Sequence, residues 1–321
     1  MQDFSSEFRN LNYVIQNAER ILLFAHTRPD HDTVGANIAL REYIRSIGKT
    51  VDISCFDRLP AFAATLFPGI IFRSPDEIDF TRYDAVIASD SVDRGFHLVR
   101  EKIPENIAVA LIDHHPNIRI SGDINIIDTG FSSSAEVIFA FFQSQGIDLT
   151  PRTATPLLMG ILEDTGNLQH SCTTPATFSA VSTLIQKGGQ LQKITEGVLS
   201  NNNIETLKLW GKALARARIN QKNGMIYSAI TAEDIRELGD PSTENLRIAS
   251  TMLNAVPDTA FSLLLYQIKP ETIRGSFRSE PHKGVDVSAI ARTFGGGGHA
   301  LAGGFEISGR IIETINGWEI R

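Results

Sequence analysis

Aspartate and histidine gather in four short segments of this 321-residue chain. The segments occupy positions 26–32, 90–94, 113–115 and 163–166. The first three directly follow predicted strands, and the fourth follows a predicted helix. Ligands bind at the carboxyl ends of the strands in open parallel sheets. We therefore expect these side chains to meet at one edge of a sheet.

The side chains in these segments favour a site for divalent metal ions. Five carboxylates packed together without cations would repel one another and raise each other's pKa values. Imidazole with carboxylate, and no thiolate, suits manganese, magnesium or iron better than a structural zinc site. Two such ions activate water for in-line displacement at phosphorus. Taken singly, Asp32, Asp90 or Asp164 could instead cap a helix, so the convergence of all four segments is what favours the metal site.

Short apolar runs alternate with helical patterns in the first half of the chain. Buried strands are predicted at 21–25, 51–55, 85–88, 107–112 and 124–127. Helices are predicted at 33–47, 133–145, 153–162 and 176–187. The strands are mostly continuous apolar stretches, which is typical of a mainly parallel sheet with helices on both faces. The predicted fold class is therefore α/β.

The second half predicts a smaller α/β domain with a mixed sheet. Its strands are predicted at 225–230, 260–267 and 272–277. We expect a first domain over residues 1–190, a linker helix region over 191–210 and a second domain over 211–321. All four segments with aspartate and histidine lie in the first domain.

Composition excludes several classes of protein. A hydrophobic content of 42% can fill two cores, and no apolar run approaches the roughly 20 residues that span a bilayer. The first seven residues lack a basic stretch followed by an apolar core, so we expect no signal peptide, no membrane partner and a cytoplasmic location. A net charge of −7 argues against coating of duplex nucleic acid. The two cysteines, Cys55 and Cys172, are predicted to be buried, reduced thiols.

The four segments resemble the four motifs of the DHH phosphoesterases, in order and at appropriate separations. The residues that carry the resemblance are His26-x-x-x-Asp30-x-Asp32-x-x-Gly35-Ala36, Asp90, Asp113-His114-His115 and Asp164-Thr165-Gly166. Further along, residues 275–279 and the run 295–303 resemble motifs of the C-terminal domain found in many DHH enzymes. The closest resemblance is to the NrnA-like subfamily of nanoRNases and pAp phosphatases.

This resemblance implies six ligands for two Mn²⁺ ions, for which Mg²⁺ or Co²⁺ could substitute. His26 and Asp30 would bind one ion, whereas the other would be bound by Asp32, His114 and Asp164. Asp90 would bridge the two ions. We expect His97, His170 and His282 not to bind metal.

The resemblance also implies roles for residues around the metals. Asp113 would orient a histidine, as carboxylates near metal-bound imidazoles usually do. His115 would face the scissile phosphate, with a structural hydrogen bond beneath the site as the alternative. Arg94 is a further candidate for binding substrate, with a surface arginine as the alternative.

In the second domain the resemblance implies a set of substrate-binding residues. Arg278 and Ser279 would hold a phosphate or a terminal nucleotide, and arginine suits bidentate phosphate contact. Gly296, Gly297 and Gly298, followed by His299, would let a phosphate or base approach the backbone closely. No Lys-Ser or Lys-Thr pair follows the glycines, so the run is not a P-loop.

The function these expectations predict is a manganese-dependent phosphodiesterase or exoribonuclease for short substrates. No additional oligonucleotide-binding domain is predicted, so the expected substrates are short single-stranded oligoribonucleotides, pAp or pApA. The chain is expected to show no duplex-specific binding, and a homodimer is compatible with the sequence.

Several alternatives to this function remain at the level of sequence. One is a phosphodiesterase of the same family acting on cyclic di-AMP or linear dinucleotides, and another is an inorganic pyrophosphatase of the same superfamily. A non-catalytic nucleotide sensor would be expected to have lost one of the six ligands, and none is missing. An HD phosphohydrolase is disfavoured because His31-Asp32 is predicted to lie in a loop, whereas that class places its ligands on helices.

Overall fold

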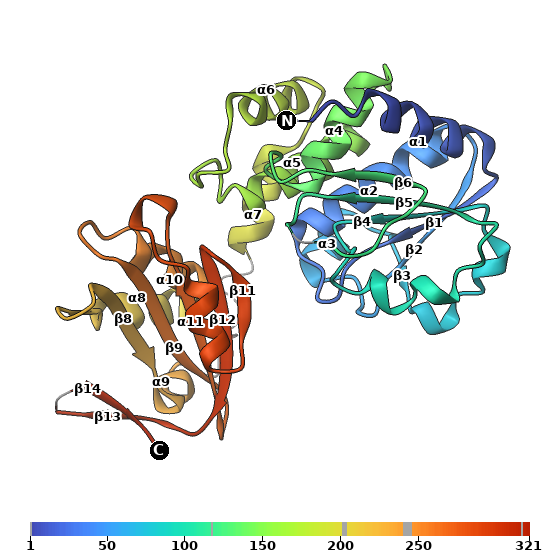
Figure 1. Cartoon of the computed structure of the whole chain (residues 1–321). Coiled ribbons are helices and arrows are strands. Elements are labelled where there is room, and N and C mark those ends of the chain that lie inside the picture. The colour runs from blue at the N-terminus through green and yellow to red at the C-terminus, as the bar shows by residue number, and fades with distance from the viewer. Residues whose placement is uncertain (1, 117, 201–203, 240–245, 316) are drawn as a thin grey trace. The chain divides into compact units, whose positions relative to one another are not determined.

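The computed structural model describes residues 2–116, 118–200, 204–239, 246–315 and 317–321 (Figure 1). The chain divides into two compact units, Met1–Val198 and Leu199–Arg321. The predicted linker region contains α7 (Leu191–Ser200) and the first half of α8 (Ile204–Ala215). Each unit has its own sheet.

The sheet of the first unit has six strands, all parallel, in the order β3-β2-β1-β4-β5-β6. The strands are β1 (Arg20–Phe24), β2 (Thr50–Ser54), β3 (Phe72–Arg73), β4 (Ala85–Ser89), β5 (Ala108–Asp113) and β6 (Ile124–Ile127). This confirms the parallel sheet expected from the sequence. Only β3 was missed, because two residues leave no pattern that a sequence can show.

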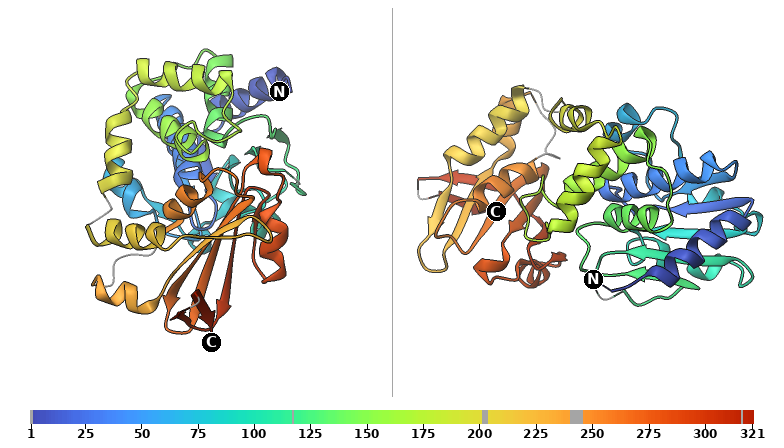
Figure 2. Two further views of the ribbon diagram at one scale, coloured as in Figure 1. Left: turned by 90° about the vertical axis from the view of Figure 1, so that its left-hand side faces the viewer. Right: turned by 90° about the horizontal axis from the view of Figure 1, so that it is seen from above.

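3₁₀ turns and loops cover one face of this sheet, and the six α-helices that precede α7 contribute to the hydrophobic cluster on its other face (Figure 1, Figure 2). They are α1 (Ser5–Asn17), α2 (His31–Ser46), α3 (Ala61–Leu66), α4 (Ser134–Ser144), α5 (Pro151–Asp164) and α6 (Pro175–Gln186). Single 3₁₀ turns occur at Pro75–Glu77, Phe80–Arg82, Phe96–Leu98 and Arg100–Lys102. Helix α5 begins two residues earlier than predicted, because Thr150 forms a capping box and Pro151 occupies the first helical position.

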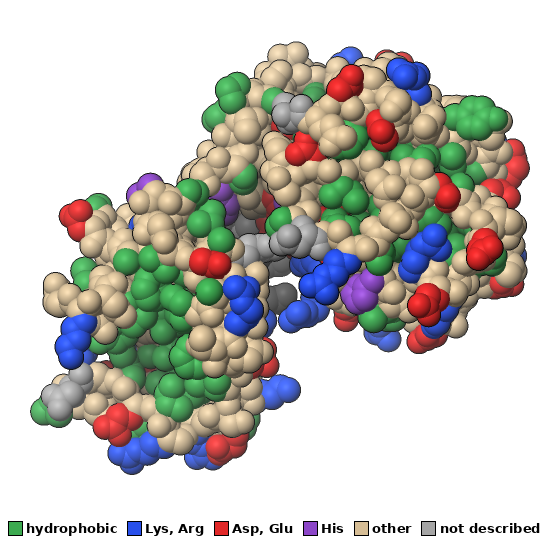
Figure 3. Space-filling model, viewed as in Figure 1, with side chains coloured by type: hydrophobic (Ala, Val, Ile, Leu, Met, Phe, Trp, Pro, Cys, Tyr) green, Lys and Arg blue, Asp and Glu red, His purple; other side chains and the backbone are tan. Residues whose placement is uncertain are grey.

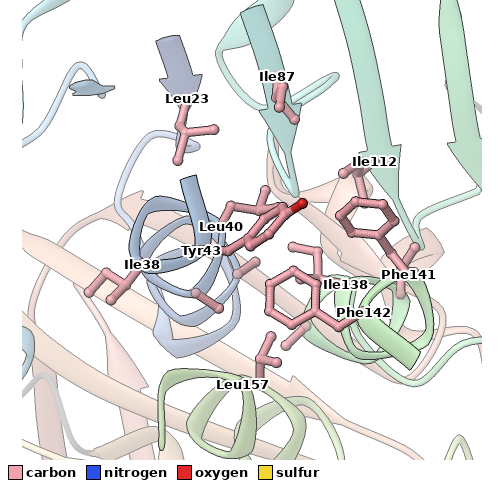
Figure 4. Packing of buried hydrophobic residues seen from close by; sticks show 14 of the residues in the cluster. Leu23, Ile38, Leu40, Tyr43, Ile87, Ile112, Ile138, Phe141, Phe142 and Leu157 are labelled. Carbon is pink, nitrogen blue, oxygen red and sulfur yellow. The ribbon is translucent and has the colours of Figure 1, made fainter. Parts of the chain in front are cut away.

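Side chains from the two faces of the sheet enter separate hydrophobic clusters. Leu23, Ile87 and Ile112 face α2, α4 and α5, where they meet the residues that Figure 4 shows. Their neighbours Leu22 and Val86 point to the opposite face and pack with the second cluster. Because both faces are buried, the strands need apolar residues at consecutive positions. This explains the continuous apolar runs in the sequence.

Helices α2 and α5 approach closely at Gly35. A Cβ atom built on Gly35 would lie 2.2 Å from the backbone carbonyl oxygen of Pro156. A backbone oxygen in a packed helix cannot move aside as the end of a flexible side chain can. The close contact therefore fixes α2, which contains the predicted ligand Asp32 and is capped by Asp30, against α5, which ends at Asp164.

Replacing Gly35 by alanine is expected to destabilise the first unit by about 3 kcal/mol, because the helices must separate to admit a methyl group. Thermal unfolding followed by circular dichroism should show a midpoint lower by about 6–12 °C. Gly211→Ala is the control, since no described atom lies within 4 Å of a Cβ atom at that position of α8. It should instead stabilise its helix slightly. An unchanged midpoint in Gly35→Ala would contradict the tight helix contact.

The second unit is built on a mixed six-stranded sheet in the order β11-β12-β10-β9-β8-β7. Its strands are β7 (Arg218–Asn220), β8 (Met225–Ile230), β9 (Phe261–Lys269), β10 (Thr272–Arg278), β11 (Gly297–His299) and β12 (Ala302–Ser308), with a separate hairpin of β13 (Ile311–Thr314) and β14 (Gly317–Ile320). Only β8 and β9 pair in parallel. The helices are α8, α9 (Ala232–Glu237), α10 (Leu246–Asn254) and α11 (Val287–Thr293), with a 3₁₀ turn at Pro281–Lys283. The mixed sheet confirms the predicted class of the second domain.

The surface of the chain carries charges of both signs. Figure 3 shows acidic and basic side chains interspersed over the visible face, and hydrophobic side chains gathered on the face of the second unit.

Within the described residues, no helix combines the length and the apolar character that crossing a membrane requires.

Candidate metal centre

Four strand and helix ends bring the predicted ligands to one edge of the parallel sheet. His26 follows β1, Asp90 follows β4, β5 ends at Asp113, and α5 ends at Asp164. The order in which the chain adds strands reverses between β1 and β4. Strands β2 and β3 extend the sheet on one side of β1, whereas β4 pairs with the other side of β1. In open α/β sheets such a reversal opens a crevice at the carboxyl ends of the strands, where ligands bind. The predicted site lies at that position.

The first group of ligand atoms consists of His26, Asp30 and Asp90, whose candidate atoms lie within 4.8 Å of one another. His26 Nε2 is 3.1 Å from Asp30 Oδ2 and 3.4 Å from Asp90 Oδ2. The other ring nitrogen, Nδ1, lies 2.7 Å from the carbonyl oxygen of Thr27. A carbonyl only accepts hydrogen bonds, so Nδ1 carries the proton and the lone pair of the neutral ring is at Nε2.

The second group consists of Asp32, His114 and Asp164, also within 4.8 Å of one another. His114 Nε2 lies 3.1 Å from Asp164 Oδ2 and 3.9 Å from Asp32 Oδ2. The same nitrogen is 3.8 Å from Asp90 Oδ1. Asp90 therefore directs one carboxylate oxygen toward each group. This is the placement that a bridging ligand requires.

Both groups fit a divalent cation. His26 Nε2 and His114 Nε2 are buried, and neither has a hydrogen-bond partner among the described residues, although carboxylate oxygens surround them. An imidazole lone pair facing a carboxylate is repulsive unless a proton or a cation lies between them. The donor set of imidazole and carboxylate suits Mn²⁺ or Mg²⁺.

The carboxylates of the centre titrate as expected for acids crowded together away from water. Burial, with the neighbouring charges of Asp32 and Asp30, raises the pKa of Asp90 well above its usual range. Burial and the charge of Asp32 raise the pKa of Asp164 in the same way. Burial raises the pKa of Asp32 to about 6. Burial also disfavours the charged form of Asp30, but His26 and then Arg94 outweigh it and lower its pKa.

Helix α4 holds Asp32 in place. The backbone N–H groups of Ser134 and Ala135 donate to its two carboxylate oxygens over 2.8 and 2.9 Å. The first turn of a helix presents free N–H groups and a positive dipole end, both of which favour an anion. On the other side, a Cβ atom at Gly160 would lie 2.7 Å from Asp32 Oδ1, so only glycine leaves room for the carboxylate.

Ser134 and Gly160 were not predicted from the sequence to belong to the site. The Ser133-Ser134 pair at the start of a predicted helix and a glycine inside another were the available signals. Neither signal indicates which distant aspartate it serves. Ser134 also donates through its hydroxyl to Asp90 Oδ1 over 3.3 Å. Asp90 itself has a φ of 56°, a left-handed conformation that is uncommon outside glycine and often occurs at functional sites.

Asp113 contacts His115 rather than either ligand group. Its Oδ1 accepts a hydrogen bond from His115 Nδ1 over 2.8 Å and from the His115 backbone N–H over 3.0 Å. His115 Nδ1 is also 3.4 Å from Asp90 Oδ1, and with His114 these residues form a third, overlapping cluster. Arg94 borders the site, with its guanidinium 3.5 Å from Asp30 Oδ2 and its side chain 40% exposed.

Two expectations about local structure were wrong. His31 and Asp32 do not lie in a loop but in the first turn of α2, where Asp30 is the N-cap and accepts from the Thr33 N–H over 3.2 Å. The helix begins earlier than predicted because the Asp30 side chain caps it. Cys172 is exposed, whereas Cys55 is buried as expected. Cys172 lies in the loop after α5, where its Sγ is 3.6 Å from the carbonyl oxygen of Asp164.

The candidate substrate residues of the second unit lie around the ends of β10, β11 and β12. The Arg278 guanidinium donates to the Phe277 carbonyl over 2.7 Å and to Ser276 Oγ over 3.3 Å. Ser279 Oγ is buried and has no hydrogen-bond partner in the part of the chain that is described. His299 belongs to β11, and its side chain lies outside the described part.

Close packing accounts for two of the three glycines predicted to bind substrate. Cβ atoms at Gly296 and Gly298 would lie 2.1 Å from the Gly304 carbonyl oxygen and 2.2 Å from the Ala302 carbonyl oxygen. At Gly297 no described atom lies within 4 Å of the Cβ position. Gly297 is therefore the one of these three at which packing leaves room beside the backbone.

Comparison with known families and proteins agrees with this architecture. Residues 20–161 match the model of the DHH family, N-terminal domain, and residues 225–318 match the DHHA1 domain. The bifunctional oligoribonuclease and PAP phosphatase NrnA of Bacillus subtilis is 28% identical over 295 residues, which cover 90% of each chain.

Solved structures show the same fold. An exopolyphosphatase-related protein from Bacteroides fragilis superposes with a TM-score of 0.85 at 20% identity, covering 94% of this chain and 91% of that one. RecJ from Thermus thermophilus in complex with Mn²⁺ gives a TM-score of 0.53 at 11% identity, covering 94% of this chain and 51% of that one. With both domain models matched in order along the chain, we conclude that it belongs to the DHH family and is a phosphoester-hydrolysing enzyme with a DHHA1 domain.

Proposed function

We propose that this enzyme is a two-metal phosphodiesterase that hydrolyses short oligoribonucleotides to mononucleotides and also acts on pAp. The observation that carries the proposal is the pair of imidazole–carboxylate groups that share Asp90. The similarity to an oligoribonuclease and PAP phosphatase over 90% of both chains supports the substrate class.

The ligands in this proposal are His26 and Asp30 for one Mn²⁺, and Asp32, His114 and Asp164 for the other, with Asp90 shared. Two divalent cations at such a site lower the pKa of water and stabilise negative charge on a phosphoryl group. Mg²⁺ or Co²⁺ would substitute for Mn²⁺ at the same imidazole and carboxylate ligands.

The remaining residues of the first unit would bind and orient the substrate. His115 donates to Asp113 through Nδ1, which fixes the tautomer and the orientation of a ring that would face the scissile phosphate. Arg94 has a partly exposed guanidinium beside Asp30, so it would contribute a positive charge and N–H donors to the same phosphate. No side-chain nucleophile is required.

We further propose that residues of the second unit bind the rest of the substrate. Arg278 and the buried hydroxyl of Ser279 would bind a phosphate or a terminal nucleotide, and His299 would contribute to the same contact. The backbone at Gly297 is open enough for a ligand to approach, with Gly296 and Gly298 holding the strand in place.

Hydrolysis of a defined set of substrates tests the proposed function. Purified protein with Mn²⁺ would be incubated with a trinucleotide, pAp, linear and cyclic di-AMP, and pyrophosphate. We expect turnover of the trinucleotide and of pAp, with mononucleotide products. Turnover of pyrophosphate alone, or of cyclic di-AMP in preference to both, would overturn the proposed substrate class. Tight binding without turnover of any of them would indicate a sensor.

Arg278→Ala is expected to raise KM for the trinucleotide about tenfold or more while leaving kcat nearly unchanged, because it removes a contact made equally in the ground and transition states. Steady-state kinetics checks this. Arg274→Ala is the matched control, four residues earlier on the same strand, where the arginine pairs with Glu306 over 3.8 Å. A loss confined to kcat would show that Arg278 acts on the transition state instead.

A further inference from the structure

The end of α5 has an unusual conformation directly after the predicted ligand Asp164. The Gly166 N–H bonds to the Glu163 carbonyl over 2.9 Å, and the Asn167 N–H bonds to the Leu162 carbonyl over 2.7 Å. These two bonds form a Schellman motif, which satisfies the carbonyls of the second- and third-last residues of a helix. The carbonyl of the last residue, Asp164, takes no part in that motif.

Side chains from further along the loop reach this carbonyl. His170 Nδ1 lies 3.1 Å from the Asp164 carbonyl oxygen, and Cys172 Sγ lies 3.6 Å from it. The carbonyl can only accept, so Nδ1 of His170 is the donor. A thiol is a weak donor, and the contact is longer, so His170 makes the stronger of the two bonds.

The backbone is arranged to bring His170 back over the helix end. Gly166, Asn167 and Leu168 all have positive φ angles, of 54°, 58° and 67°. A left-handed conformation costs leucine about 1–2 kcal/mol. Leu168 is held there by packing against the main hydrophobic cluster and by its N–H, which donates to Thr165 Oγ1 over 3.1 Å.

The imidazole ring then lies against Gly166. A Cβ atom at that position would be 2.3 Å from His170 Nε2 and 2.6 Å from Cδ2. Glycine is thus required at position 166 both by φ and by the ring. The His170 N–H also donates to the Thr165 carbonyl over 2.8 Å, which closes the loop on itself.

We infer from this geometry that His170 is a positioning residue for Asp164. Its Nδ1–H holds the backbone of the last helical residue, and so fixes the carboxylate whose Oδ2 lies 3.1 Å from His114 Nε2. The inference rests on the proposed metal centre, to which it adds a residue that is not itself a ligand. Partners that orient metal ligands typically change metal affinity or activity 10–100-fold when removed.

Three substitutions of His170 distinguish the contribution of its Nδ1–H donor from the contribution of ring packing. Asparagine can place an amide N–H where His170 has Nδ1, glutamine places its amide near the position of Nε2, and alanine has neither. We expect His170→Ala and His170→Gln to weaken binding of one of two Mn²⁺ ions by about 10–100-fold, and His170→Asn to restore binding close to that of the wild type. Cys172→Ala is the matched control on the same carbonyl and should bind like the wild type.

The measurement is calorimetric titration of Mn²⁺ into the chelator-treated full chain, with thermal unfolding of each metal-free variant alongside. Wild-type affinity in all three His170 variants would overturn the inference. So would an Asn variant as weak as the Gln variant, since ring packing would then be responsible, or a loss in Cys172→Ala equal to that in His170→Ala. A wild type that binds no Mn²⁺ would overturn this inference and the proposed function together. A wild type that binds two ions but hydrolyses no substrate would overturn the proposed function alone.

Discussion

Asp90→Asn is expected to abolish turnover of every substrate, with kcat lower by about 10³-fold or more. Asp90 directs one oxygen toward each imidazole–carboxylate group, so the amide leaves both groups one charged ligand short. Its other expected effect has the opposite sign. In the absence of metal the variant should be at least as stable as the wild type, because it removes a buried charge from among three neighbouring carboxylates.

This pairing of outcomes distinguishes a ligand from a residue that merely supports the fold. Activity is measured by release of mononucleotides, and stability by thermal unfolding in the presence of a chelator. Asp93→Asn is the matched control, since Asp93 is an exposed carboxylate in the same segment. A variant that stays active would refute the shared-ligand assignment. One that loses activity together with most of its metal-free stability would show that Asp90 has a structural role.

The metal-free protein is expected to be more stable at pH 5 than at pH 7, and Mn²⁺ is expected to reverse this order. Burial raises the folded-state pKa of Asp32 to about 6, and the pKa values of Asp90 and Asp164 are raised as well. An acid with a higher pKa in the folded than in the unfolded state binds protons more readily when folded, so its contribution to stability grows as pH falls toward the unfolded value. Asp30 has a lowered pKa, so it titrates at lower pH and leaves this window unaffected.

Mn²⁺ competes with these protons. Binding requires deprotonated carboxylates, so stabilisation by the ion should be greatest near pH 7 and should shrink in acid. At a concentration of 100 times Kd one ion adds about 2.7 kcal/mol, or about 5–10 °C in the unfolding midpoint of a unit of this size.

Unfolding midpoints between pH 5 and pH 8, with either chelator or Mn²⁺, test this reversal. Asp90→Asn is the control, because it should flatten both the rise of metal-free stability toward acid and the stabilisation by Mn²⁺. Metal-free stability that declines steadily from pH 7 to pH 5, together with no shift by Mn²⁺ at pH 7, would contradict the proposed centre.

Much of this site could be predicted from local sequence. Three of the four acidic segments were recognised because each lies directly after a buried apolar strand, and the continuity of those strands indicated a parallel sheet covered on both faces. Adjacent motif residues such as Asp113, His114 and His115 keep their spacing in any fold. Their types alone identified imidazole and carboxylate as the donors, and so the class of metal.

Tertiary structure alone decided how these groups are oriented and supported. Asp32 is held by the start of α4, about a hundred residues away, and Gly160 of α5 leaves the space for its carboxylate. Asp113 accepts a hydrogen bond from His115. Three residues with left-handed backbone conformation turn the chain so that His170 reaches the carbonyl oxygen of Asp164. Periodicity and spacing report only which way a residue faces within its own helix or strand. Which groups meet across distant segments, and with which atom, is set by the packing of those segments against each other.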